Sequence, residues 1–343
     1  MHKAQTGNKR GHSPFVSSVI IFGWFLLLLL AISAISVVFR VKGLSWDNLA
    51  DIFVIDPKDV MDYTVWQVRA PRVLLAVLLG AGLAVAGGLL QGMTRNPLSD
   101  PEVLGVNQGA SCLVVISLLL FGDQNATIVI LLAAFLGAAA GGSVIYLLAF
   151  RGVYSAYRVV LAGAAVSLFL GALTTGVILL HETKLSEILY WMAGKLSGAN
   201  WSDIRIVLIP VLVAVAGAFA LAQPMNVLAL GEDAAQGLGM NTLRLRRVLA
   251  VLVVLLAGSA VAVAGPIGFV GLMVPHMARR LVGHDYRMLL PFSALLGANL
   301  LVAADFAAQW ITYPADVPVG IITALLGTPF FLYLLRRKQG VAK

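Results

Sequence analysis

Charged residues and cysteine are both scarce in this sequence. Charged residues make up 12% of the 343 residues, about half the share of an ordinary soluble domain, and 60% of the residues are hydrophobic. So few charges cannot cover a water-soluble surface. The single cysteine, Cys112, excludes a disulfide framework and a thiolate metal site, so we expect it to be a small buried residue.

Motifs that would supply energy or catalysis are also missing. Gly194-Lys195 lacks the earlier glycine of a phosphate-binding loop, and Leu196 follows where that loop needs Ser or Thr. An intramembrane hydrolase needs a nucleophile and a base at one depth, and the nearest pair, Ser111 and His276, lies at different depths. We therefore expect no enzyme activity, cofactor or metal site in this chain.

Long apolar stretches are what the sequence does contain, and the mean hydropathy is +0.93. Each stretch is about twenty residues, enough to cross a hydrocarbon core of roughly 30 Å. Strand-length alternation is absent, so we predict an all-α polytopic membrane protein with one transmembrane domain over residues 1–343. The predicted spans are residues 16 to 38, 72 to 92, 103 to 121, 126 to 149, 158 to 180, 205 to 222, 245 to 264, 267 to 282, 288 to 308 and 318 to 336.

The basic residues are distributed unevenly between the predicted loops. With the N-terminus in the cytoplasm, 16 of the 24 Lys and Arg residues fall in inward loops and tails. This positive-inside bias favours an even number of spans, with the N- and C-termini both cytoplasmic. It places the tail 1–15 and the polar loop 223–247 inside. The net charge of +8 thus orients the protein in the lipid bilayer and does not indicate a nucleic-acid partner.

Ionisable residues within the predicted spans are rare. An ion-coupled carrier keeps such groups deep in the membrane, because burying a charge there is costly. The one clear case, Asp305, lies within about a turn of the outer end of its span, where interfacial anchoring or helix capping is the simpler interpretation. An ion-coupled secondary transporter is therefore the weaker alternative.

Polar and Pro/Gly motifs stand at the ends of the predicted helices. They are Arg69-Ala70-Pro71-Arg72, Gly92 to Pro101, Tyr190 to Gly194, Leu230 to Gly239, Gly265 to Leu272 and Gly327-Thr328-Pro329. From about residue 60 to 336 the chain resembles the permease family of ABC importers for iron-siderophores, haem and cobalamin. The resemblance implies a type II importer permease with ten helices in the bacterial cytoplasmic (inner) membrane.

The same resemblance implies the partners. They are two ATP-binding subunits that carry the ATP and Mg, an extracytoplasmic substrate-binding protein, and a second permease that is either this chain or a paralogue. A ferric siderophore is the leading cargo because it is the family's most common one, while haem and cobalamin stay open. The glycine-containing helix 158 to 180 is predicted to line the pathway.

Site residues follow from the resemblance as well. The family's coupling helices dock on the ATPase from the loop between the sixth and seventh spans. The matching residues here are Leu230, Gly231, Glu232, Asp233, Ala234, Ala235, Gly237 and Gly239. Glycines on either side of a short helix allow sharp entry and exit, so we predict a rigid knob.

The predicted docking residues for the binding protein are Arg69 and Arg72. Their family counterparts meet carboxylates of the binding protein, and ordinary interfacial arginine is the alternative. Where the family often has a further arginine this chain has Gln309, so that contact is not carried over. Inward helix ends are expected at Asn96, Pro97, Pro275 and His276, where proline stops a helix and an amide caps backbone groups; gating or ATPase contact is the alternative.

Overall fold

The computed structural model describes residues 14–41, 60–102, 105–121, 126–149, 156–180, 185–311 and 315–339. These residues form helices and loops without a strand, which confirms the all-α class for the described part of the chain. Of the predicted tail 1–15, residues 1–13 lie outside the described residues. The predicted spans each coincide with a helix: α1 (Pro14–Val38), α3 (Ala70–Thr94), α4 (Val106–Phe121), α5 (Ala126–Ala149), α6 (Ala156–Leu179), α8 (Trp201–Ala220), α11 (Thr242–Ala264), α12 (Val270–Val282), α13 (Tyr286–Ile311) and α14 (Val319–Gln339).

Not every one of these helices is a full membrane span. Within the described residues, 7 helices are long and apolar enough to cross a membrane, and α4 and α14 are apolar but shorter. Helix α12 has 13 residues and rises only about 20 Å. The chain is therefore a multi-pass membrane protein in which α12 begins inside the bundle.

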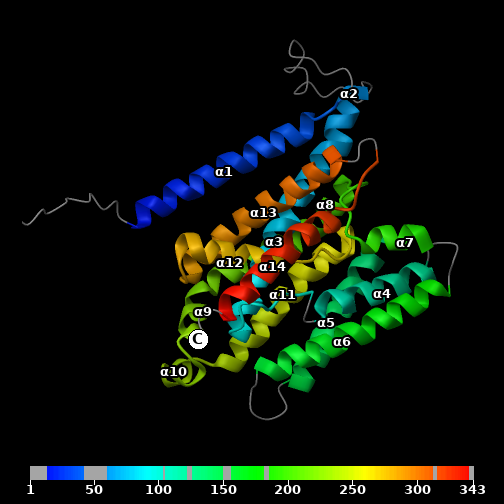
Figure 1. The fold of residues 1–343 in the computed structure, drawn as a ribbon. Coiled ribbons are helices and arrows are strands. Elements are labelled where there is room, and N and C mark those ends of the chain that lie inside the picture. The colour runs from blue at the N-terminus through cyan, green and yellow to red at the C-terminus, as the bar shows by residue number, and fades with distance from the viewer. Residues whose placement is uncertain are drawn as a thin grey trace, which may run out of the picture.

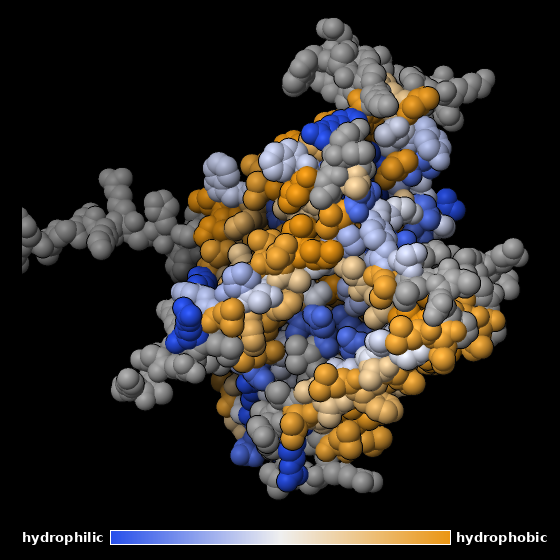
Figure 2. Space-filling view, turned by 45° about the vertical axis from the view of Figure 1, so that its right-hand side comes forward, coloured by the Kyte–Doolittle hydropathy of each residue, from blue (hydrophilic) through white to orange (hydrophobic). Residues whose placement is uncertain are grey.

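The helices are arranged around α3, which lies in the middle of the bundle, while α1 lies along the outside (Figure 1). The apolar window ending in α3 is 83% buried, whereas that of α1 is 6% buried. Helix α3 packs against α13, α11 and α12, while α4, α5 and α6 pack together on one side. Leucines and other large apolar side chains cover much of the outer surface (Figure 2), as expected for helices whose outer sides meet lipid tails.

Glycine allows α3 to touch its neighbours through the backbone. A Cβ added at Gly80 would overlap the carbonyl oxygen of Gly297 in α13. A Cβ at Gly87 would overlap the carbonyl oxygen of Gly271 in α12. Small residues at such crossings let membrane helices approach closely, so any side chain at these positions would force the helices apart.

Among the described residues, five short elements accompany the long helices: α2 (Val60–Tyr63), η2 (Thr64–Arg69), α7 (Leu185–Met192), α9 (Ala222–Ala229) and α10 (Glu232–Gly237). The π-helix η2 joins α2 to α3 just before Pro71, and Ala70 N–H bonds the oxygen of Val65 five residues earlier. Proline has no N–H to donate to the preceding turn, so the wider π turn stands where an α-helical bond would be lost.

Two opposite ends of the bundle matter for function. We call the end that holds the starts of α3 and α14 and the end of α13 the mouth. The other end, which holds the ends of α3 and α12 together with α9 and α10, is the basic end. Figure 1 shows α2 and α10 at these opposite ends.

Candidate functional site

An ion-pair network built on Arg72 organises the mouth. Arg72, in the first turn of α3, donates from Nη2 to Asp305 Oδ1 at 2.9 Å and from Nε to Asp305 Oδ2 at 3.0 Å. Its Nη1 donates to Asp316 Oδ2 at 3.0 Å. The Arg72 and Asp305 side chains are 7% and 2% exposed, and that of Asp316 is 38% exposed. The guanidinium therefore has one buried partner and one partner at the surface.

Gln309 extends this network to Arg69. Arg69 Nη1 donates to Gln309 Oε1, and Gln309 Nε2 donates to Asp305 Oδ2 at 2.7 Å. An amide can accept from one group and donate to another, whereas an arginine at this position could only donate. Gln309 thus gives Arg69 an acceptor inside its own chain.

A second set of contacts ties the mouth to the loop after α7. Tyr190 Oη donates to the carbonyl oxygen of Asp316 at 2.8 Å, and Gly320 N–H donates to the oxygen of Gly194 at 3.0 Å. Lys195 N–H donates to the oxygen of Ala264 at 2.7 Å. The end of α7 and the turn that follows it therefore hold the start of α14 against the end of α11.

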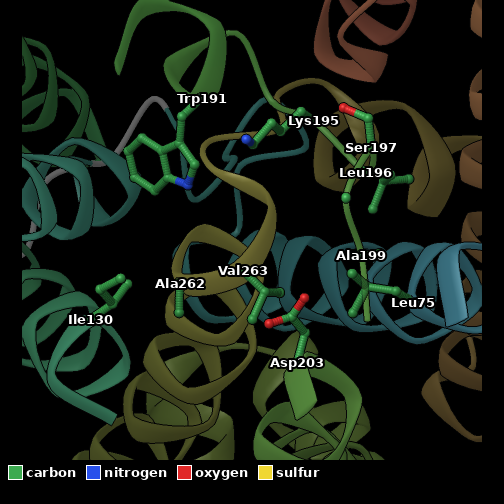
Figure 3. Close-up of a pocket in the computed structure, with 11 residues that line it drawn as sticks. Leu75, Ile130, Trp191, Lys195, Leu196, Ser197, Ala199, Asp203, Ala262 and Val263 are labelled. Atoms are coloured by element: carbon green, nitrogen blue, oxygen red, sulfur yellow. The ribbon is translucent and has the colours of Figure 1, made fainter. Parts of the chain in front are cut away.

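A small cavity of about 230 Å³ lies beside this turn (Figure 3). Trp191, Lys195 and Asp203 supply its polar groups, and the Asp203 carboxylate points towards it. Asp203 also accepts from Asn200 N–H at 3.1 Å as part of the α8 capping box. Ligand pockets commonly occupy about 300 to 1,000 Å³, so this cavity is too small to be a pocket for a large cargo.

The loop from Arg95 to Gly105 folds back into the bundle. Asp100 is 4% exposed, and its Oδ2 would lie 3.1 Å from a Cβ on Gly271. Gly271 in turn contacts Gly87 of α3. Gly87 lies seven residues before the end of α3 at Thr94, which is about 10 Å along the helix at a rise of about 1.5 Å per residue. Asp100 therefore lies inside the bundle, next to the contact between α3 and α12.

Glu102 follows the same path and lies against Gly268. The two carboxylates face the first turn of α12, and the N-terminus of a helix favours negative charge. They are the clearest functional candidates that sequence reasoning missed. The only sequence signal was their position between Pro97 and Gly105, inside a motif and not in a plain connecting loop.

Pro275 and His276 do not stand at a helix end, because α12 continues to Val282. Pro275 cannot donate to Gly271, four residues earlier in the same helix. Gln91 of α3 supplies the missing donor: its Nε2 lies 2.9 Å from Gly271 O. The proline is tolerated in the helix interior because this neighbour replaces the lost bond, and His276 packs edge-on against Phe330.

Asn96 and Pro97 do lie where predicted, immediately after α3. The helix ends at Thr94, Arg95 adopts the left-handed conformation, and Asn96 Oδ1 accepts from Leu98 N–H at 3.0 Å. This turn directs the chain back towards α12. A gating role for these residues stays a prediction.

At the basic end, α10 forms the short projecting helix that was predicted between flanking glycines, and it runs from Glu232 to Gly237. Gly231 has φ +130° and Gly239 has φ +80°, conformations that favour glycine, so the chain can enter and leave α10 sharply. Leu230 and Leu238 flank α10 and are 71% and 69% exposed. Ala235 is buried and turns inward. The predicted loop 223–247 also contains helix α9, which sequence reasoning did not predict.

Several polar contacts hold α9 and α10 to the bundle. Glu232 Oε2 accepts from Arg246 Nη2 at 2.9 Å, and Arg95 Nη2 donates to Leu228 O at 3.1 Å. Asn226 Nδ2 donates to Asp285 Oδ1 at 2.6 Å. The Arg287 N–H and the Asn226 amide hold the pKa of Asp285 below its ordinary value. The remaining predicted coupling residues, Asp233, Ala234 and Gly237, lie on the exposed surface of α10.

The fold and these two polar ends define the class of protein: a helical, multi-pass membrane permease. Residues 26–337 match the FecCD transport family, and the chain belongs to that family. This confirms the resemblance and makes the chain the permease of an ABC importer, not an enzyme.

Known proteins agree with this assignment. The chain is 43% identical over 343 residues to an Fe(3+)-citrate import system permease protein of Bacillus subtilis, covering 99% of both chains. It is 41% identical over 276 residues to a cobalamin import system permease protein of Halobacterium salinarum, covering 80% of this chain and 74% of that one. A solved structure described as an inward-facing metal-chelate type ABC transporter has TM-score 0.82 and 31% identity, covering 93% and 99%.

Proposed function

We propose that this permease imports a ferric chelate of the siderophore class across the bacterial cytoplasmic membrane. The observation that supports this choice of cargo is the 43% identity, over 99% of both chains, with a relative named for Fe(3+)-citrate import. Cobalamin and haem are the alternative cargoes, and the cobalamin relative matches a smaller share of the chain. The basic end faces the cytoplasm, and so do both termini, because cytoplasmic loops of membrane proteins are rich in Lys and Arg.

The mouth receives the loaded binding protein. Arg69 is half-buried at the mouth and donates to Gln309, which places its guanidinium where a carboxylate of the partner would dock. Arg72 already neutralises the buried Asp305. A docking carboxylate would therefore reach Arg72 by displacing Asp316, the exposed member of the network.

The α9–α10 segment receives the ATPase. Leu230 and Leu238 form an exposed apolar pair at a polar end of the molecule, which is typical of a surface that a partner covers. Arg95 links this segment to the end of α3, and the other end of α3 carries Arg72 and follows directly on Arg69. A displacement of α10 by the ATPase would therefore be transmitted to the mouth through one buried helix, α3. ATP and Mg belong to the two ATPase subunits, and a second permease, identical or paralogous, completes the pathway beside α6.

The test is transport by the assembled importer in proteoliposomes. The permease is reconstituted with its ATPase and binding protein, and uptake of ⁵⁵Fe-labelled citrate, hydroxamate and catecholate complexes is compared with uptake of labelled cobalamin. ATP-dependent uptake of one iron complex is expected. Uptake of cobalamin alone would refute the cargo, and uptake driven by a proton gradient without ATPase would refute the importer mechanism.

A further inference from the structure

A large cationic cavity opens at the basic end. It has a volume of about 820 Å³ and lies between the ends of α3, α12 and α14 and the start of α13. Its lining includes Arg95, Arg279, Arg280, His276 and His284, and no acidic residue is among the described residues that line it. A cavity with this lining favours an anion.

Neutral groups hold its arginines in place. Arg279 Nη1 donates to Gln91 Oε1 at 2.6 Å, and Gln91 is itself fixed by its bond to the Gly271 carbonyl that Pro275 leaves free. Arg280 lies over the Tyr333 ring, 5.8 Å from its centroid. In the described part of the chain, neither Arg279 nor Arg280 has a carboxylate partner, so their charges are oriented but not neutralised.

Apolar surface continues directly from the rim of the cavity. Met277 and Leu281 of α12 are exposed, and so are Leu332 and Tyr333 of α14. The Tyr333 ring is the one over which the Arg280 guanidinium lies. A ligand that fits both regions has an anionic head and an apolar body, placed where helices end and lipid headgroups begin.

We propose that this cavity binds the phosphate headgroup of an anionic phospholipid of the cytoplasmic leaflet, with its acyl chains along α12 and α14. The choice of the cytoplasmic leaflet depends on the orientation given under the proposed function, in which the basic end faces the cytoplasm. The headgroup accepts hydrogen bonds from Arg279 and Arg280 of α12, in the space that α3 and the start of α13 also line. Arginine is suited to this role because its planar fork can bind two phosphate oxygens at once.

Native mass spectrometry of the purified chain in a neutral detergent tests the proposal. Phosphatidylglycerol is titrated against phosphatidylcholine, which has no net charge. The test variant is Arg279→Gln with Arg280→Gln, and the matched control is Arg244→Gln with Arg247→Gln, two exposed arginines of α11 at the same end. Each arginine is worth about 1 kcal/mol towards an anionic headgroup, so the test variant should bind phosphatidylglycerol roughly thirtyfold more weakly.

Several results would overturn the proposal. These are equal affinity for the two lipids, an equal loss in both variants, or displacement of the lipid by glycerol phosphate at the same concentration, which indicates a site for a soluble anion. Unchanged lipid binding with lost ATPase assembly in the test variant would assign the cavity to an acidic segment of that partner. Unfolding temperatures without lipid show whether the variants fold. Because the assay needs neither transport nor orientation, it can succeed when the proposed cargo fails.

Discussion

Replacing Asp305 by Asn removes the buried half of the Arg72 network and should destabilise the protein strongly. The two side chains differ little in size, so the change leaves packing intact and removes one charge. Arg72 then keeps its charge at 7% exposure with only the surface carboxylate of Asp316 to balance it. The matched variant is Asp316→Asn, which removes the exposed partner and leaves the buried one.

The structure sets different magnitudes for these two variants. Breaking a buried ion pair by removing one partner costs about 3 to 5 kcal/mol, and the remaining contact with Asp316 favours the lower figure for Asp305→Asn. An exposed ion pair is worth at most about 1 kcal/mol, which bounds Asp316→Asn. A chain of this size loses about 2 °C in its unfolding temperature per kcal/mol. The unfolding temperature should therefore fall by about 6 °C in Asp305→Asn and by no more than about 2 °C in Asp316→Asn.

The assay is thermal unfolding of the purified variants, all in the same detergent. Unfolding is monitored as the loss of soluble monomer with rising temperature. A charge-free double variant, Arg72→Met with Asp305→Leu, should recover much of the loss because it leaves no unpaired buried charge. Equal destabilisation by Asp305→Asn and Asp316→Asn would refute the reasoning. So would a double variant less stable than Asp305→Asn alone.

Three further predictions concern the two ends. Arg69→Glu should abolish stimulation of the ATPase by the binding protein, measured in proteoliposomes, while leaving basal hydrolysis unchanged; an unaltered response excludes the docking role. Glu232→Arg should uncouple hydrolysis from uptake with normal insertion, and Arg246→Glu in the same chain should restore part of the coupling; normal uptake by Glu232→Arg alone contradicts the coupling role. Because its pKa is lowered on folding, Asp285 stabilises the α9 attachment above its ordinary pKa of about 4, and this contribution is lost as the pH falls through the lower folded value. The protection factors of the amides of residues 222–229, which correct for the slower intrinsic exchange in acid, should therefore fall in acid in the wild type, and Asn226→Ala should remove this pH dependence.

Most of the fold was predictable because lipid imposes a simple rule. A segment that faces hydrocarbon must be apolar and about twenty residues long, so hydropathy alone placed helices such as α5 and α13 within a few residues. The projecting α10 was predictable for a local reason too, since Gly231 and Gly239 bracket a polar stretch too short to span.

The polar contacts were not predictable, because they depend on distant parts of the chain. Arg72 and Asp305 are 233 residues apart, and no local pattern shows that α3 and α13 cross at Gly80 and Gly297. The position of Asp100 has the same origin: its carboxylate packs against Gly271 of α12, a contact that no local pattern of the sequence shows. Proline rules alone suggested that Pro275 stops a helix, and the donor that rescues it, Gln91, comes from another helix.

The backbone contact between Gly80 and Gly297 restricts how the importer can change shape. Helices that meet through side chains can slide by exchanging rotamers, but two helices in backbone contact have no such freedom. We therefore expect α3 and α13 to move together, with the hinges of the transport cycle in the helices around them. A Cβ at Gly80 would overlap the Gly297 carbonyl and push the two helices apart, so Gly80→Ala should leave ATP hydrolysis running while the pathway no longer opens in response.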